Sequence, residues 1–227
     1  ICNGKWKTRV ENLENIPITF SGRATSMVKN VLPSVLAASL SDISLERIRA
    51  GLQTFIASPE QTPGRMNIFH FKYFNVMVDY AHNRASIVEL NEFMKTVQAS
   101  EKIGIITAVG DRRDEDIRNI GRMAAEVFDS IIIRHDKDMR GRSPEEMTDL
   151  LMNGIHSVRS EMPVMIIPDE LEAIAHAMNF APKGAFITVF TENVREALAF
   201  VEEELSQEQP EAHAQRGAMS GNLRVAS

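Results

Sequence analysis

Short apolar runs alternate with longer segments of helical period between residues 65 and 205. The apolar runs predict strands at Val76–Asp79, Ile103–Val109, Ser130–Arg134, Val164–Ile167 and Ala185–Phe190, with a hairpin partner near Met66–Phe71. The segments between them predict helices at Ala85–Val97, Asp114–Val127, Pro144–Ile155, Glu170–Asn179 and Glu192–Leu205. Strands and helices that alternate in this way predict an α/β fold with a mostly parallel sheet covered by helices on both faces.

Capping signals mark the starts of several predicted helices. Ser143 is followed by a proline at the first helical position and by Glu146 at the third, which is a capping box. Asp169 precedes its helix with a similar spacing of acidic residues. Asn83 and Asp114 are expected to cap the helices that follow them.

Residues 1–60 form a first block with weaker signals. Ile16–Phe20 predicts a short strand at a sheet edge, because its proline cannot donate a hydrogen bond to a neighbouring strand. Helices are expected at Met27–Leu40 and Leu45–Phe55. The first of them contains a proline that favours a kink or a restart, and Ser44 is expected to cap the second.

The turn-rich stretch Ser58–Gly64 is the expected domain boundary. We therefore expect residues 1–62 to end one domain, 63–205 to form a second, and 206–227 to be a tail that is disordered or ordered by a partner. The last helix has one apolar face, formed by Val194, Leu198, Val201 and Leu205. That face could pack in the core or form a contact between subunits, so the sequence leaves both a monomer and a homo-oligomer possible.

Composition narrows the class of protein. The chain has 227 residues, 44% hydrophobic and 25% charged, as is usual for a soluble globular protein. It has no apolar run long enough to span a bilayer and no signal peptide. The single cysteine, Cys2, excludes internal disulfides, disfavours a zinc cluster and fits a cytoplasmic location. The net charge of -6 disfavours nonspecific nucleic-acid binding.

Polar side chains follow three of the predicted strands. Asp79-Tyr80-Ala81-His82-Asn83 comes after the first, Gly110–Asp114 after the second, and Arg134–Arg142 after the third. Because ligands bind at the carboxyl ends of strands in open parallel sheets, we expect these loops to line one shared edge that faces the first block. The alternative is that they are polar only because loops in such folds usually are.

Several side chains in these loops have two interpretations. His82 is a general acid or base, or a positioning group that bonds a backbone carbonyl, and its neighbours do not suit a metal site. Arg65 follows a Pro-Gly turn and could contact phosphate, or be an ordinary surface arginine. Asp111–Asp114 could be an internal salt-bridge network. Alternatively, these residues bind an anion, and Arg112 is the member best placed to do so because it lies near a helix N-terminus.

The loop Arg134–Arg142 mixes cations with carboxylates, which suits a zwitterionic small molecule better than a polyanion. In this interpretation Arg134, Arg140 and Arg142 bind a carboxylate or phosphate, while Asp136 and Asp138 bind an amine or guanidinium. A solvated loop is the alternative. The chain has no G-x-x-x-x-G-K-[ST], G-x-G-x-x-G or G-x-S-x-G motif, so the sequence predicts ligand-positioning residues and no complete catalytic apparatus.

These motifs resemble a known family. Pro63-Gly64-Arg65-Met66, Val78-Asp79-Tyr80-Ala81-His82-Asn83 and Gly110-Asp111-Arg112-Arg113-Asp114 are similar to the C-terminal domain of the Mur ligase superfamily, whose members form amide bonds with ATP. The resemblance implies a Rossmann-like domain, preceded in residues 16–55 by the end of the family's central ATPase domain, with Asn30 at that domain's usual asparagine. One departure is Arg84, where the family usually has proline.

The resemblance also implies roles. In the family, ATP phosphorylates a carboxylate and an amine displaces the phosphate; Arg65 would contact the ATP phosphates and Asp79 the ribose, with His82, Asn83 and Arg112 shaping that site. Within the family the motifs are closest to the member that adds arginine to a polyaspartate backbone. Asp111, Arg134, Asp136, Asp138, Arg140 and Arg142 would then bind the incoming amino acid.

The family's phosphate-binding loop is absent from the chain, which begins at Ile1 rather than Met. We therefore expect the chain to be part of a longer ligase, inactive alone, with Mg²⁺ held largely by an upstream segment. Two alternatives are a Mur-type ligase that acts on a cell-wall precursor or folate, and a non-catalytic relative that binds a nucleotide or amino acid.

Overall fold

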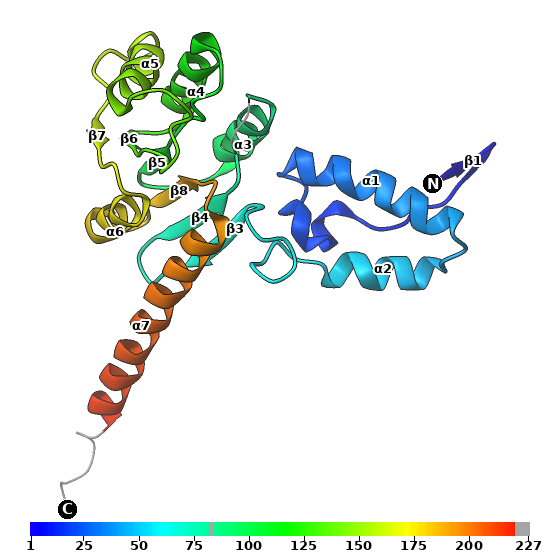
Figure 1. Cartoon of the computed structure of the whole chain (residues 1–227). Coiled ribbons are helices and arrows are strands. Elements are labelled where there is room, and N and C mark those ends of the chain that lie inside the picture. Colours follow the sequence, from blue (N-terminus) through cyan, green and yellow to red (C-terminus); the bar gives the residue numbers. More distant parts are fainter. Residues whose placement is uncertain (82–83, 221–227) are drawn as a thin grey trace, which may run out of the picture.

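The computed structural model describes residues 1–81 and 84–220 (Figure 1). A six-stranded sheet has the strand order β3-β4-β8-β5-β6-β7. The strands are β3 (Asn67–His70), β4 (Asn75–Asp79), β5 (Lys102–Ile106), β6 (Ser130–Ile133), β7 (Val164–Ile166) and β8 (Phe186–Phe190). Only β3 is antiparallel to its neighbour, and it pairs with β4 as the predicted hairpin. The mostly parallel α/β sheet predicted from the sequence is confirmed.

Helices cover both faces of this sheet. They are α3 (Arg84–Thr96), α4 (Asp114–Val127), α5 (Pro144–His156), α6 (Glu170–Phe180) and α7 (Val194–Ser220). One face buries Ile87, Ile117 and Leu151 from α3, α4 and α5, and the other buries Ile174 and Val201 from α6 and α7. The four central strands, β4, β8, β5 and β6, are buried nearly throughout, because a parallel sheet packed on both sides needs apolar side chains in both directions, whereas the edge strands β3 and β7 are partly exposed.

The parallel order brings the carboxyl ends of five strands to one edge of the sheet. The loops after β5 and β6 are neighbours at this edge. Strands β8 and β5 lie between β4 and β6, so the ends of β4 and β6 are about 14 Å apart at ordinary strand spacing. The expected shared edge therefore exists, but its three predicted loops are not all adjacent.

Among the helix caps predicted for the larger domain, two are confirmed and one is wrong. The Ser143 hydroxyl accepts a hydrogen bond from the Glu146 amide at 3.1 Å, and Asp169 accepts two from the first turn of α6. The N-cap of α4 is Arg113 rather than Asp114. Asp114 is already helical, and its carboxylate pairs with Arg118 one turn later in α4 and with Arg142 of the loop after β6. The expected Asn83 cap lies outside the described residues.

The first block is a small helical lobe. It contains a two-stranded ribbon, β1 (Cys2–Asn3) and β2 (Trp6–Lys7), two 3₁₀ turns, η1 (Leu13–Asn15) and η2 (Pro17–Thr19), and the helices α1 (Thr25–Leu40) and α2 (Leu45–Thr54). The predicted strand at Ile16–Phe20 is wrong, because η2 uses its proline at a first helical position. Ser44 caps α2 as expected.

The lobe packs on α3 of the larger domain (Figure 1). The rings of Phe20 and Phe93 are 5.2 Å apart, and Lys29 Nζ lies 3.1 Å from a Glu89 carboxylate oxygen. Met27 belongs to the same hydrophobic cluster as α3 and α4, so the two parts share a core. The opposite side of α1 exposes Leu32, Leu36 and Leu40.

Helix α7 begins on the sheet and extends away from it (Figure 1). Leu198 and Val201 are buried against the sheet, so the apolar face belongs to the core. The helix continues to Ser220, beyond its predicted end at Leu205, and the expectation of a tail that is disordered or ordered by a partner stays a prediction. Glutamate and glutamine dominate positions 202–208, and both residue types favour helix without needing burial. Among the described residues, no helix is long and apolar enough to cross a membrane.

Candidate functional site

The loops after β5 and β6 are joined backbone to backbone. A side chain at Gly110 would overlap the Met139 carbonyl, so only glycine permits this approach. Arg142 holds the contact, because its Nε donates to the Gly110 carbonyl at 2.8 Å and its Nη2 to the Arg112 carbonyl at 2.9 Å. Arg142 also pairs with Glu146, so its guanidinium is engaged in the structure of the rim.

Arg140 forms the outer part of the same rim. Its Nη1 lies 2.8 Å from Asp111 Oδ2 and its Nη2 lies 3.4 Å from Glu192 Oε2. Its backbone has a φ of 49°, and its amide donates to Asp138 Oδ1 at 2.9 Å, which stabilises a conformation that L-residues rarely adopt. Asp111 and Arg140 were predicted as site residues, and the structure brings them together.

Arg134 lies beneath this rim with only 2% of its side chain exposed. It pairs with Asp136, and its Nη2 donates to the Phe190 carbonyl of β8 at 3.1 Å. Glu170 Oε1 lies 3.8 Å from the same nitrogen. Two nitrogens of the Arg134 guanidinium are therefore engaged within the protein, and its proposed contact with a ligand carboxylate or phosphate stays a prediction.

A cavity of about 610 Å³, here the charged cavity, opens above these residues. Four predicted residues line it, namely Arg134, Asp136, Asp138 and Arg140, whereas Asp111 and Arg142 only support its wall. The lining also holds Glu170, Glu192 and Glu196, which the sequence analysis missed. Glu170 begins the helix that follows β7, and Glu192 lies in the loop that follows β8, so the rule about strand ends would have found both had it been applied to the segments after the last two strands.

Burial shifts two titrations at this cavity. It raises the pKa of Glu170 above its usual value, and the nearby Arg134 only partly offsets that effect. Burial also lowers the pKa of His135, whose Nε2 is 2.8 Å from the Thr148 hydroxyl. Burial therefore disfavours the charged forms of both the Glu170 carboxyl and the His135 imidazole.

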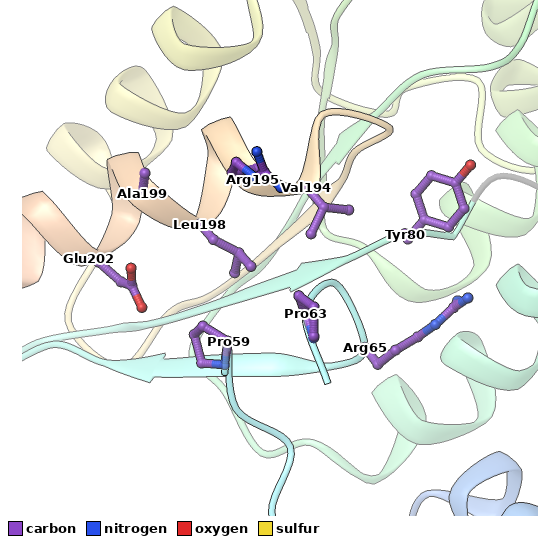
Figure 2. Close-up of a pocket in the computed structure, with 9 residues that line it drawn as sticks. All are labelled: Pro59, Pro63, Arg65, Tyr80, Val194, Arg195, Leu198, Ala199 and Glu202. Atoms are coloured by element: carbon purple, nitrogen blue, oxygen red, sulfur yellow. The ribbon is translucent and has the colours of Figure 1, made fainter. Parts of the chain in front are cut away.

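Arg65 projects from the domain junction (Figure 2). Gly64 has a φ of 68° and packs so closely on α7 that a Cβ would lie 2.7 Å from Val194 Cγ2. The Arg65 guanidinium carbon is 5.6 Å from the centre of the Tyr80 ring. Both residues line a groove of about 610 Å³ between residues 59–63 and α7, here the linker groove.

Arg65 also borders a second hollow, here the lobe cavity, of about 390 Å³. Its walls come mainly from the first lobe, and its lining includes Asn30, Ser34, Leu52, Phe55 and Thr62. Asn30, which the resemblance placed in the central ATPase domain, and Arg65, which it assigned to the ATP phosphates, thus line the same cavity. The lining is mostly apolar with one cation, as suits a planar base with a charged tail.

Asp79 ties the junction to the sheet. It is buried, and its Oδ2 accepts a hydrogen bond from the Met66 amide at 2.8 Å. Its carbonyl accepts one from Thr191 at 3.0 Å, at the same end of β8 whose Phe190 carbonyl holds Arg134. The end of β8 therefore links the Arg65 turn to the charged cavity. His82 and Asn83, predicted for this site, lie outside the described residues.

Arg112 is exposed and only weakly paired, with its Nε 3.9 Å from Asp111. The first turn of α4 contains Asp114, Glu115 and Asp116, which already complement the helix dipole and reduce its attraction for an anion. In the described ranges 1–81 and 84–220, no group of three histidine, cysteine or acidic side chains could hold a metal ion.

The larger domain thus combines a mostly parallel α/β sheet, polar loops at the ends of its strands and an arginine at the junction with the first lobe. The pattern of the family described as "Mur ligase, glutamate ligase domain" matches residues 64–193. The chain belongs to this family, as the motifs predicted.

Relatives agree with that assignment. The chain is 40% identical to cyanophycin synthetase of Trichormus variabilis over 92% of its own length and 24% of that protein. It therefore spans about a quarter of the length of the curated relatives it matches first.

Solved structures show the same fold. UDP-N-acetylmuramate-alanine ligase from Thermotoga maritima matches with a TM-score of 0.58 at 18% identity, covering 80% of this chain and 38% of that one. The bifunctional folylpolyglutamate synthase/dihydrofolate synthase from Yersinia pestis, complexed with AMPPNP and a Mn ion, matches with a TM-score of 0.55 at 21% identity, covering 70% and 35%.

Proposed function

We propose that this chain is the C-terminal part of an ATP-dependent amide-bond-forming ligase that adds arginine to a polyaspartate backbone. The observation that carries the proposal is the position of Arg65, which borders a cavity shared with Asn30 of the first lobe and a groove shared with Tyr80. A nucleotide held between two lobes needs a cation at that junction for its phosphates.

Each residue has a proposed part in binding. Arg65 contacts the phosphates, while Asp79 contacts the ribose and, through its bond to the Met66 amide, keeps the Arg65 turn in place. His82, Asn83 and Arg112 complete the nucleotide site. No catalytic residue is assigned to this chain, and Mg²⁺ is proposed to be held by a segment outside it. The reaction takes place in the cytoplasm.

The charged cavity is the proposed site of the incoming amino acid. Arg140 and Asp138 lie at its mouth, and Asp136 lies on its wall. Identity of 40% to a cyanophycin synthetase, over nearly the whole chain, supports arginine as the amino acid. Positioning the amine beside the activated carboxylate is the contribution expected of such a domain.

Phosphate release tests the proposal in the full protein that contains this chain. The assay contains ATP, Mg²⁺ and an aspartate-backbone primer, and offers arginine, lysine, glutamate or diaminopimelate one at a time. Arginine should raise the rate most. A response to another amino acid would indicate a cell-wall or folate type of ligase, and no response to any of them a binding protein without catalysis. Residues 1–227 alone should release no phosphate.

A further inference from the structure

The charged cavity has an excess of negative charge. Its lining contains six carboxylates against three lysine or arginine side chains. Within the described part of the chain these carboxylates form no group that could hold a metal ion. The surplus therefore favours an organic cation in the cavity.

Five of these carboxylates already have partners. Asp136 pairs with Arg134, Asp138 accepts from the Arg140 amide, Asp169 caps α6, Glu192 pairs with Arg140, and Glu196 pairs with Lys137. Each of these five carboxylates therefore has at least one oxygen engaged within the protein, while Asp136 Oδ2 accepts no hydrogen bond among the described residues.

Glu170 differs from the other five. Only 11% of its side chain is exposed, and its Oε1 lies 3.8 Å from Arg134 Nη2, which is too far for a hydrogen bond. Counting the described residues alone, neither Glu170 Oε1 nor Asp136 Oδ2 accepts a hydrogen bond, although both atoms are buried. At the wall of the cavity, two acceptors without donors thus flank one arginine, whose own Nε is a buried donor without an acceptor among the described residues. Buried acceptors in native proteins are normally paired, so these two point to a missing donor.

We propose that Glu170 makes this cavity selective for a positively charged side chain, whose guanidinium donates to Glu170 and Asp136. A guanidinium has five N–H donors in a planar fork, and so can serve two carboxylates at once. The inference rests on the proposed function, since it takes the charged cavity as the amino-acid site. It transfers the recognition of the cation from the exposed Asp138 to a buried residue of α6.

Calorimetric binding to the full protein tests the inference. Arginine is compared with citrulline, which has nearly the same shape but a neutral ureido group. The variant is Glu170→Gln, which keeps the side-chain length and removes the charge. The matched control is Glu172→Gln, because Glu172 is exposed, lies in the same first turn of α6 and does not line the cavity. Thermal unfolding of both variants checks that the fold is kept.

The unaltered protein should bind arginine more tightly than citrulline. Glu170→Gln should weaken arginine about 10- to 100-fold, as expected for a hydrogen bond between charged groups, and reduce the preference over citrulline by a similar factor. Glu172→Gln should change neither. An unchanged preference in Glu170→Gln, equal weakening of both ligands, or no arginine binding by the unaltered protein would overturn the inference. Arginine binding that depends on Glu170, without arginine-stimulated phosphate release, would instead contradict the proposed function alone.

Discussion

The charged cavity and the lobe cavity are built in opposite ways. The charged cavity belongs to one domain, and ion pairs and backbone contacts centred on Arg134 and Arg140 hold its walls. The lobe cavity is lined mainly by the first lobe, and Arg65 reaches it from the junction. The first cavity is therefore preorganised by its own loops, whereas the second depends on how two parts of the molecule lie against each other.

The largest expected effect lies at the junction. Arg65→Ala should lower kcat/KM for ATP in the full protein by roughly 100-fold, because it removes the cation proposed for the phosphates. Stability should change little, since Arg65 is exposed. Arg195→Ala is the control, as Arg195 lines only the linker groove and is equally exposed. Equal loss in both variants, measured by steady-state kinetics, would remove Arg65 from the nucleotide site.

The next effect concerns the rim of the charged cavity. Gly110→Ala should destabilise the protein by about 1–3 kcal/mol, because the added methyl group overlaps the Met139 carbonyl. Gly51→Ala on α2 is the control: nothing lies within 4 Å of its Cβ position, so the variant should be stabilised by about 0.5–1 kcal/mol. Urea unfolding measures both. A neutral Gly110→Ala would show that the two loops separate without cost.

A smaller effect is expected on the pH dependence of folding stability, through Glu170 of the charged cavity. The pKa of Glu170 is raised by burial, so the folded state holds that proton more tightly than the unfolded chain does. Ionised Glu170 therefore costs stability at neutral pH, and this cost fades as the pH falls toward the unfolded pKa of about 4.3. Glu170→Gln should be more stable than the unaltered protein at pH 7 and should lose that advantage near pH 4, as followed by urea unfolding. A variant less stable at pH 7 would mean that the pairing with Arg134 outweighs burial.

The smallest effect is expected where the lobes touch. The Lys29–Glu89 ion pair is largely exposed, and such pairs contribute less than about 1 kcal/mol. Lys29→Met should therefore leave KM for ATP within about twofold and make little difference to unfolding, because the rings of Phe20 and Phe93 and the shared core hold the lobe. A large rise in KM would show that this ion pair sets the lobe position and would strengthen the contrast between the two cavities.

Local patterns along the chain determined most of the elements. The apolar period found five parallel strands, their helices and the β3–β4 hairpin, because burial on two faces demands apolar residues at known spacings. The capping rules found Ser44, Ser143 and Asp169, because these side chains bond amides two or three residues away. The failures at Ile16–Phe20 and beyond Leu205 have the same cause: a short or solvated segment has no burial pattern to mark its structure.

Strand order and side-chain partners came only from the tertiary structure. The sequence placed Asp79, Asp111 and Arg134 at strand ends, but the insertion of β8 between β4 and β5 decided which of them are neighbours. Residue type alone could not tell that Arg134 and Arg142 are bound within the protein, or that Glu170 lies buried beside Arg134. Charge and hydrogen-bonding capacity belong to the residue, whereas burial and choice of partner depend on segments far away in the chain, so the sequence identified the groups and the fold determined which are available to a ligand.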